Sequence, residues 1–305
     1  MTTPLVIVVA KHSAYRRYVE VRKDTRTLQL LAANDETVSG LRRSHDEHEA
    51  TLDYVLSMLQ ALGVRTRILS IPHKPFSARG ASLVLAIGGD GTLLHASHFV
   101  DSSTPILGIN SSPSTSVGFF CALKSSTAKT GVAKALRGDL PVLDLARMEV
   151  RLNGRLVSRR VLNDALFCHA SPAATSRYLV HVGKDQEEHK SSGFWMGPAA
   201  GSTAAQRSAG GKVLPLGSQD LQFVVREPFL FAGPLRFSRL LVPAGSRLEV
   251  CSKMREAKVF LDGPHNVVDV GLGDRLKFSL SPEPLHVLGL SKRRGRGLAL
   301  PSHIR

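Results

Sequence analysis

The chain has 305 residues, enough for one large domain or two modest ones with a proper core. Forty Lys and Arg residues against 25 Asp and Glu residues give a net charge of +15, which attracts polyanions. Aromatic residues make up only 6%, and no nucleic-acid-reading motif is present, so we expect no nucleic-acid partner. No apolar run reaches membrane-spanning length, and the three cysteines lack metal-ligand spacing. We therefore expect no membrane partner, and a reducing, cytoplasmic location.

The first half of the chain alternates apolar strands with amphipathic helices. Its start fits a buried strand better than a secretory leader. Strands are expected at 5–10, 65–71, 82–87 and 105–110. Helices are expected at 45–63 and 92–100. This spacing predicts an α/β domain with a doubly wound, mostly parallel sheet, in which ligands bind at the carboxyl ends of the strands. Gly88 and Asn110 both stand at such ends.

Near Pro141 the pattern changes to short runs rich in Val, Leu, Phe and Arg, separated by Gly, Pro and Asn. Asn153-Gly154 is a hairpin signal within this part. We expect the α/β domain at 1–141, a β-rich domain at 142–280, and a C-terminal tail at 281–305 whose return to the first domain is open. The basic run at 291–297 is interpreted first as a solvated tail and only second as a nucleic-acid contact.

A Gly-Gly-Asp-Gly-Thr pentapeptide begins at Gly88, where a buried strand meets a helix. Gly88, Gly89 and Gly91 can adopt positive φ and leave no side chain in the way of a ligand. Amides at the start of the helix favour an anion, and Thr92 is expected to cap this helix or to touch a phosphate. Asp90 would repel a phosphate. It therefore has a compensating role, holding Mg²⁺ beside the phosphates or accepting a proton from an attacking hydroxyl. The alternative for Asp90 is a helix cap in a tight turn.

A second stretch, residues 197–215, consists mainly of small residues. Such a surface lets a flat ring lie on the backbone and reach amides and hydroxyls, among them those of Ser202, Thr203 and Ser208. The alternative is a tight loop packed inside the β-rich domain. The stretch is long and poor in Val, Ile and Leu, which favours a ligand-facing role.

Together these motifs resemble the NAD kinase family. The pentapeptide alone is shared with diacylglycerol, sphingosine and 6-phosphofructo kinases, but its combination with the Gly-Ser-Thr-Ala segment at 201–204 is specific. Segments 105–120 and 161–167 also match, so the resemblance covers most of the chain. It implies transfer of a phosphate from ATP, or in some members inorganic polyphosphate, to the adenosine 2′-hydroxyl of NAD⁺ or NADH. It also implies Mg²⁺ or another divalent cation, a β-rich dinucleotide-binding domain and a homo-oligomer, either a dimer or a tetramer.

Carried over by position, the resemblance implies that Asp90 accepts the proton and that Gly91 is its neighbour in the dinucleotide contact. Phe119 matches an aromatic that packs on the adenine, although a core phenylalanine is as good an interpretation. Asn163 and Asp164 match an Asn–acid pair that holds the ribose, and a plain turn is the alternative. The nucleotide-binding set also contains Gly88, Gly89, Thr92 and Asn110. No residue is assigned as a direct metal ligand.

Three further positions, Thr203, Ala204 and Ser208, match the stretch under the adenosine and the nicotinamide ribose. The twelve histidines show no metal spacing. His98 is interpreted as a packing or surface residue. His95 stands close enough to the pentapeptide for contact with a phosphate to be an open alternative to packing.

The chain departs from the family pattern at three places. Ala205 stands where many members have tyrosine, and the loop from Asn110 to Phe119 is three residues longer than usual. Ser192 replaces an acid that lies near the nicotinamide ribose in the family. These departures resemble the plant-type NADH kinase branch, which implies a preference for NADH. Loss of the negative charge points the same way, because it weakens the binding of NAD⁺ more than that of neutral NADH.

Two other functions stay open at this point. One is a different kinase of the pentapeptide group that acts on a lipid or sugar hydroxyl, against which the polar loop at 197–211 argues. The other is a non-catalytic nucleotide sensor, against which Asp90 argues.

Overall fold

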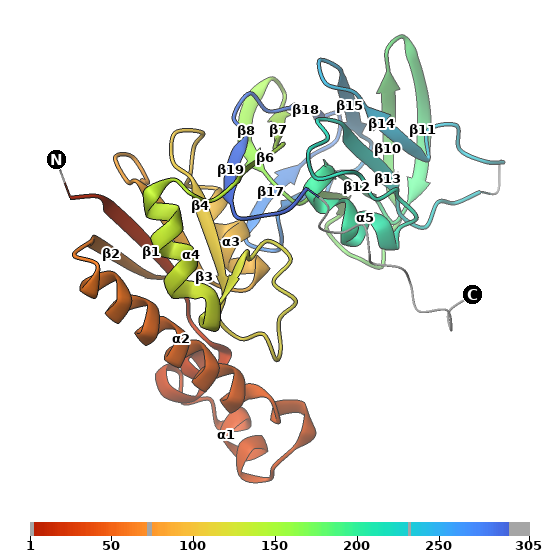
Figure 1. Ribbon diagram of the computed structural model, residues 1–305. Helices are drawn as coiled ribbons and strands as arrows, with labels where there is room; N and C mark the ends of the chain where they lie inside the picture. The colour runs from red at the N-terminus through yellow and green to blue at the C-terminus, as the bar shows by residue number, and fades with distance from the viewer. Residues whose placement is uncertain (1–2, 72–74, 231–232, 293–305) are drawn as a thin grey trace, which may run out of the picture. The chain divides into compact units, whose positions relative to one another are not determined.

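The computed structural model describes residues 3–71, 75–230 and 233–292 (Figure 1). The chain divides into two compact units. One consists of Met1–Leu143 and His286–Leu290, and the other contains Asp144–Leu285. Of the basic run at 291–297, residues 293–297 lie outside the described residues.

A mostly parallel sheet forms the centre of the first unit. Its strand order is β2-β1-β3-β4-β19-β6, and the short β5 pairs with β4. β1 lies between β2 and β3 in parallel register, with Val8 opposite both Ile68 and Leu85. β3 and β4 are buried along their whole length, as expected for strands covered on both faces. The strands are β1 (Leu5–Lys11), β2 (Arg65–Ile71), β3 (Leu83–Gly88), β4 (Ile106–Asn110), β5 (Leu123–Lys124), β6 (Val142–Leu145) and β19 (Leu285–Leu288).

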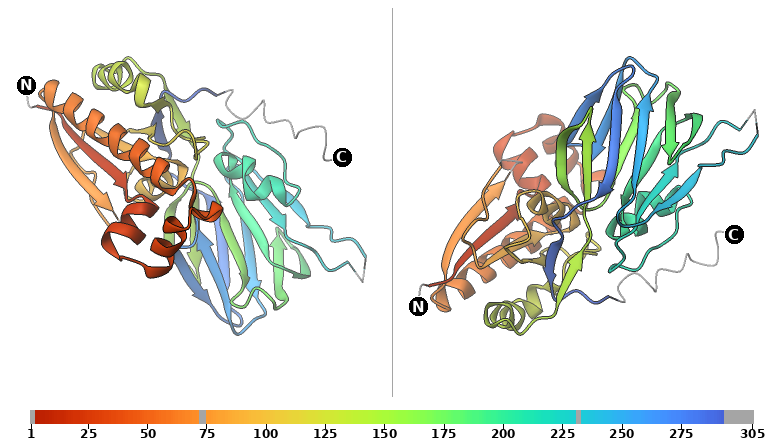
Figure 2. Two further views of the ribbon diagram at one scale, coloured as in Figure 1. Left: turned by 90° about the horizontal axis from the view of Figure 1, so that it is seen from below. Right: turned by 90° about the horizontal axis from the view of Figure 1, so that it is seen from above.

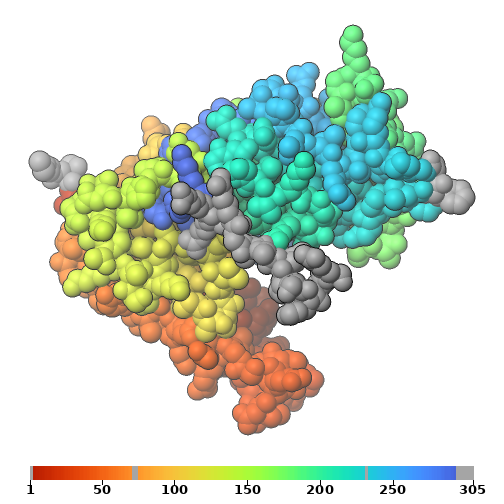
Figure 3. Space-filling model, turned by 45° about the vertical axis from the view of Figure 1, so that its right-hand side comes forward, coloured from red at the N-terminus to blue at the C-terminus, as the bar shows by residue number. Residues whose placement is uncertain are grey.

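Helices cover this sheet. Val55 and Leu59 on α2 pack with the apolar strand residues into one core, to which Ala128 and Val132 of α4 also belong. Segment 16–38 contains no buried residue and stands out from the rest of the unit (Figure 3). The helices are η1 (Arg16–Val21), α1 (Thr25–Ala32), η2 (Glu36–Val38), α2 (Leu41–Ala61), α3 (Asp90–Ser97) and α4 (Ser125–Arg137). The predicted α/β class of this part is confirmed, and no helix of the described residues is long and apolar enough to cross a membrane.

The second unit consists of two six-stranded antiparallel sheets, which Figure 2 shows stacked face to face. Their orders are β11-β10-β15-β18-β7-β8 and β14-β13-β12-β9-β16-β17. Asn153 and Gly154 join β7 to β8 with φ of 50° and 80°, as the hairpin signal predicts. The strands are β7 (Met148–Leu152), β8 (Arg155–Val161), β9 (Ala165–His169), β10 (Ser176–Val182), β11 (Asp185–Ser191), β12 (Phe194–Pro198), β13 (Leu221–Val225), β14 (Arg239–Val242), β15 (Arg247–Ser252), β16 (Ala257–Leu261), β17 (Asn266–Val270) and β18 (Arg275–Leu280).

One aromatic cluster joins the two sheets. The ring of Phe194 on β12 lies 5.1 Å from Phe167 and 4.8 Å from Phe223, both in its own sheet. It also lies 5.2 Å from Tyr178 and 5.9 Å from Phe278, which belong to the other sheet. All five rings are fully buried, so they form the centre of a single core. The strands around this core carry the connection that forms η3 (Ala199–Thr203) and α5 (Ala205–Ser208).

Candidate functional site

The pentapeptide forms a turn in which β3 passes directly into α3. β3 ends at Gly88, Gly89 is the helix N-cap, and Asp90 begins the helix. None of the three glycines uses the positive φ that glycine allows, and Gly89 has φ −106°. Glycine is needed here for space. A Cβ on Gly88 would collide with the side chain of Thr92, and one on Gly89 would come 2.5 Å from the Ser116 hydroxyl.

Thr92 and Gly91 occupy different surroundings in this turn. Thr92 does not cap α3, because the N-cap residue is Gly89 and no side chain makes a capping hydrogen bond at the start of this helix. The Thr92 hydroxyl instead lies against Gly88. A Cβ built on Gly91 would meet nothing within 4 Å, so the backbone of Gly91 is open to its surroundings.

The Asp90 carboxylate is held by the loop that follows β4. Its Oδ2 accepts the backbone N–H of Phe119 at 2.9 Å, and its Oδ1 accepts that of Phe120 at 2.7 Å. Asp90 therefore does not act as a cap of its own helix, although its charge in the first turn of α3 is favoured by the helix dipole. Each carboxylate oxygen has two lone pairs, so a lone pair on each stays available to a ligand.

Asn110 and Phe119 belong to the same loop. The buried Asn110 amide donates to the Ser116 carbonyl at 2.9 Å and its oxygen accepts the Ser112 N–H at 3.2 Å, so this side chain shapes the loop. Phe119 is half-buried and packs edge-on against Phe120 at 5.1 Å. The first unit thus brings Gly88–Thr92, Asn110 and Phe119 together around the Asp90 carboxylate.

A polar network on α2 holds the serine-rich part of this longer loop. Glu47 Oε2 accepts hydrogen bonds from the hydroxyls of Ser114 at 2.7 Å and Ser112 at 3.0 Å. These bonds, with that of Ser114 the largest, hold the pKa of Glu47 below its usual value. Beside it, His48 Nδ1 lies 2.8 Å from the Ser111 hydroxyl. Burial and then the charge of Lys11 lower the pKa of His48 to about 4, so this histidine is neutral at pH 7.

In the second unit, Asn163 and Asp164 stand directly before β9. The Asn163 side-chain amide donates to Asp164 Oδ2 at 2.7 Å. Asp164 is only 6% exposed. Burial, followed by the charge of Asp262, raises the pKa of Asp164 to about 7. The predicted Asn–acid pair is therefore a joined unit, whose acid is partly protonated at neutral pH.

Asp262, which follows β16, anchors this pair and was missed by the sequence analysis. Its Oδ1 accepts the N–H groups of Asn163 at 2.7 Å and Asp164 at 3.0 Å, and its Oδ2 accepts that of Leu162 at 2.8 Å. Asp262 has φ of 52°, in the left-handed region. The only local signal is an Asp-Gly pair after a strand, which indicates a turn and gives no hint of its partner 98 residues away.

The small-residue stretch packs against the same pair. A Cβ on Gly201 would collide with the carbonyl oxygen of Asn163, so only glycine fits there. Gln206 donates to the same oxygen at 3.3 Å and accepts from Gln222 at 3.0 Å. The Ser202 hydroxyl is used internally, since it donates to the Ala199 carbonyl at 2.7 Å and accepts the Leu214 N–H at 2.9 Å.

The other predicted residues of this stretch have accessible surface. Thr203 is half-buried, and Ala204 and Ser208 are exposed. Beside Asp164 lies an apolar pocket whose other lining residues are Leu166, Trp195, Phe260, Gly263 and Pro264. The second unit therefore brings Asn163 and Asp164 together with the 201–206 segment and this pocket.

Ser192 lies just past the end of β11. Its N–H donates to the Arg226 carbonyl at 3.1 Å, and the Arg226 guanidinium is 3.5 Å from the Ser192 carbonyl. The same guanidinium stacks on Trp195 at 5.6 Å from the ring centre. The guanidinium also lies 3.9 Å from the exposed carboxylate of Glu227, so a cation that is paired only at the surface borders the position where the family pattern has an acid.

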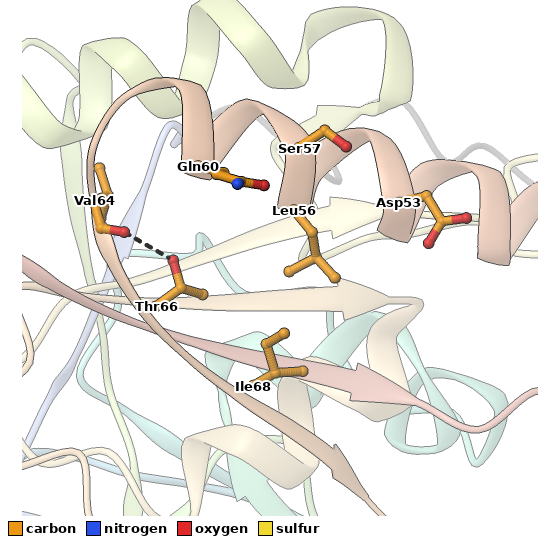
Figure 4. Close-up of a pocket in the computed structure, with 7 residues that line it drawn as sticks. All are labelled: Asp53, Leu56, Ser57, Gln60, Val64, Thr66 and Ile68. Carbon is orange, nitrogen blue, oxygen red and sulfur yellow. Dashed lines mark hydrogen bonds between the residues drawn. The ribbon is translucent and has the colours of Figure 1, made fainter.

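Three further observations bear on ligand binding: they concern a groove, the grouping of possible metal ligands, and His95. A groove between α2 and β2 is shown in Figure 4, with Leu56 and Ile68 at its centre and polar residues at its margin, and it contains none of the predicted site residues. Within the described part of the chain, no three His, Cys, Asp or Glu side chains are grouped so that they could hold a metal ion. His95 packs edge-on against Phe99 at 5.2 Å.

Comparisons with known proteins agree with this architecture. The family model described as the ATP-NAD kinase N-terminal domain matches residues 14–140. The probable NADH kinase of Oryza sativa subsp. japonica is 33% identical over 285 residues, which cover 85% of this chain and 86% of that protein. The NADH kinase of Arabidopsis thaliana is 31% identical over 291 residues, covering 87% of this chain and 92% of that protein.

Two solved structures have a similar fold. An NAD kinase from Archaeoglobus fulgidus in complex with ATP has a TM-score of 0.66 at 20% identity and covers 96% of each chain. Yeast NADH kinase complexed with NADH has a TM-score of 0.73 at 14% identity, covering 97% of this chain and 86% of that one. The match to full-length relatives above 30% identity, together with the family model over the first unit, shows that the chain belongs to the NAD kinase family.

Proposed function

We propose that this protein is an NAD(H) kinase, which transfers the terminal phosphate of ATP to the adenosine 2′-hydroxyl of NAD⁺ or NADH. The plant relatives that match most of its length are NADH kinases, and its fold is shared with kinases whose structures hold ATP and NADH. The observation that carries the proposal is the carboxylate of Asp90. It is fixed by two backbone N–H groups at the carboxyl end of β3, where ligands of doubly wound sheets bind.

Asp90 acts as the proton acceptor in this proposal. The 2′-oxygen attacks the terminal phosphorus of ATP, the bond from that phosphorus to the bridging oxygen breaks, and ADP leaves. The hydroxyl proton passes to Asp90 as the new bond forms. Phosphoryl transfer depends mainly on positioning and charge neutralisation, so an oriented carboxylate is sufficient for this task.

The family also implies a divalent cation. Mg²⁺ is usually held by one or two carboxylates together with substrate phosphates and water. Because Asp90 serves as the proton acceptor, we assign no side chain as a direct metal ligand and propose that the phosphates of the donor hold the cation. When bound, the cation would neutralise charge on the phosphates.

We assign the dinucleotide to the joined pair Asn163–Asp164 and to the surface formed by Thr203, Ala204 and Ser208. An amide and a carboxyl group 2.7 Å apart suit adjacent ribose hydroxyls. The half-buried ring of Phe119 is assigned to the adenine face.

A preference for NADH is part of the same proposal. Ser192 offers no negative charge, and the Arg226 guanidinium lies 3.5 Å from its carbonyl. A cation in this place opposes the positively charged nicotinamide ring of NAD⁺ and leaves neutral NADH unaffected. We also propose a homo-oligomer in the cytoplasm, for which light scattering and cell fractionation are the tests.

The decisive experiment incubates the pure protein with Mg²⁺-ATP and either NAD⁺ or NADH, and follows formation of NADP⁺ or NADPH. The proposal expects both products, with a higher kcat/KM for NADH. A protein that binds ATP and forms neither product would be a nucleotide sensor, and the kinase proposal would be wrong.

A further inference from the structure

We propose that Lys11 binds the phosphates of the nucleotide donor, at the crevice between the carboxyl ends of β1 and β3. This inference rests on the proposed kinase function and names a donor-binding residue that the sequence motifs do not reveal. Lys11 is the last residue of β1, in a segment that precedes the region matched by the family model.

The topology locates this crevice. β1 is flanked by β2 on one side and β3 on the other, while β4 follows β3 away from β1. The chain that leaves β1 therefore re-enters the sheet as β2, on one side of the β1–β3 pair. The chain that leaves β3 re-enters the sheet as β4, on the opposite side of that pair. In doubly wound sheets, such a reversal between two adjacent parallel strands opens the crevice in which nucleotides bind. The pairing of Ala10 with Ile87 in parallel register puts the next residues, Lys11 and Gly88, side by side at this edge.

Two polar contacts lead from the pentapeptide to His48, a residue on which the charge of Lys11 acts. The Gly88 carbonyl accepts the Ser111 N–H at 3.1 Å, and the Ser111 hydroxyl lies 2.8 Å from His48 Nδ1. The charge of Lys11 in turn helps to lower the pKa of His48. His48 is thus neutral, so it does not compete with Lys11 for an anion.

The charge of Lys11 is not neutralised within the described residues. No ion pair joins its ammonium to any carboxylate of that part of the chain, although the side chain is half-buried. Glu47 is the carboxylate that acts on it at longer range, and Glu47 is already bonded to Ser112, Ser114 and Arg43. Burial lowers the pKa of Lys11 against the opposing effect of Glu47.

A half-buried ammonium group without a counter-ion costs free energy unless an anion binds to it. A triphosphate supplies that anion, and the exposed backbone of Gly91 at the start of α3 supplies additional N–H donors on the other side of the crevice. Arg16, the next cation of the segment after β1, lies 3.6 Å from Glu49 and is thus already paired.

The test compares Lys11→Met with Lys11→Arg and with the control Lys134→Met. Lys134 is an exposed lysine in the last turn of α4. This helix begins at the carboxyl edge of the sheet and runs back toward the opposite edge, so Lys134 lies away from the proposed crevice. Each variant is assayed for the KM of ATP and of NADH. The Kd of Mg²⁺-ATP is measured separately by calorimetry without dinucleotide, and the melting temperature reports folding.

Lys11→Met should raise the KM and Kd for ATP about 10- to 100-fold, the usual loss for one charged hydrogen bond. The KM for NADH should change less than twofold. Lys11→Arg should recover most of the ATP affinity, and Lys134→Met should match the wild type. If Lys11→Met melts well below the wild type, Lys11→Gln takes its place in the same comparison.

An unchanged ATP affinity in a folded Lys11→Met protein overturns the assignment, and so does an equal loss for ATP and NADH. If the wild type binds ATP without forming NADP(H), the proposed function is wrong while the calorimetric Kd still decides the role of Lys11. If the wild type does not bind ATP, both are wrong.

Discussion

Asp262 holds Asp164 through both of its backbone groups. Asp262 Oδ1 accepts the Asp164 N–H at 3.0 Å, and the Asp262 N–H donates to the Asp164 carbonyl at 2.9 Å. This arrangement fixes a second negative charge beside a carboxyl group that is already buried. Burial makes the larger contribution and Asp262 the smaller one, and together they raise the pKa of Asp164 from 3.8 to about 7. The acid of the proposed ribose site is therefore a group that titrates near neutral pH.

The first prediction concerns the dependence of stability on pH. Between about pH 4 and pH 7 the folded protein keeps the Asp164 proton and the unfolded chain loses it. The free energy of unfolding therefore falls as the pH rises through this window. Over this pH window, the free energy of unfolding of Asp164→Asn should fall by about 3 kcal/mol less than that of the wild type. Urea unfolding at both ends of the window measures it, with exposed Asp269→Asn as control. An identical pH dependence in the wild type and in Asp164→Asn would contradict the assigned titration.

The second prediction concerns the support of the Asn–acid pair. Asp262→Ala removes the acceptor of three backbone N–H groups, so the free energy of unfolding should fall by about 2–4 kcal/mol. Asp269→Ala breaks only the surface pair with Lys258, so its effect should stay under about 1 kcal/mol. Denaturant titration compares the two variants. Equal effects would mean that Asp262 does not anchor the turn.

Asp90→Asn should lower kcat for phosphate transfer by about 10²- to 10⁴-fold, because the amide cannot accept the hydroxyl proton. The asparagine oxygen still accepts one of the two loop N–H groups, but the other N–H loses its acceptor, so the variant should fold with a free energy of unfolding lower by about 1–3 kcal/mol. Asp46→Asn, an exposed change on α2, serves as control. A folded Asp90→Asn enzyme with near wild-type kcat would rule out the role of Asp90 as base.

Gly201→Ala should disturb the proposed dinucleotide site, since its Cβ would collide with the Asn163 carbonyl oxygen. We expect a loss of about 1–3 kcal/mol in the free energy of unfolding and a higher KM for NADH. The KM for ATP should stay close to the wild-type value. The control is Gly217→Ala, where a Cβ meets nothing within 4 Å. Normal NADH kinetics in Gly201→Ala would argue that this contact has no part in binding.

Ser192→Asp should raise kcat/KM for NAD⁺ relative to NADH by roughly fivefold, which corresponds to about 1 kcal/mol for one added charge. The new carboxylate would offset the Arg226 guanidinium beside it. Ser192→Asn introduces a side chain of the same size as aspartate but without the charge, so it should leave the ratio of kcat/KM for NAD⁺ and NADH unchanged. If both variants shift the ratio alike, side-chain size and not charge determines the preference.

Local patterns were sufficient for much of the fold. The apolar runs 82–87 and 105–110 predict the fully buried strands β3 and β4, because strands covered on both faces carry continuous apolar side chains. The helix at 125–137 was not predicted. Its alanines and small residues give a weak apolar stripe, and only Ala128, Gly131 and Val132 are buried.

Less of the candidate site was accessible from the sequence. The pentapeptide glycines can adopt positive φ, but composition does not reveal whether glycine is required for its dihedral angles or for the space beside it. In the structure, the side chains of Thr92 and Ser116 occupy that space. Asp262 was missed because its partner Asp164 is 98 residues away and becomes a neighbour only through the pairing of β16 with β9.

The interior place of β19 has a consequence for synthesis. This strand, residues 285–288, lies between β4 and β6, although those two strands are complete by residue 145. A nascent chain therefore carries a gap in its first sheet until residues 285–288 have left the ribosome. Cutting the gene after residue 145 would yield a fragment in which the position between β4 and β6 is empty. This fragment should aggregate unless it is expressed together with a 285–290 segment.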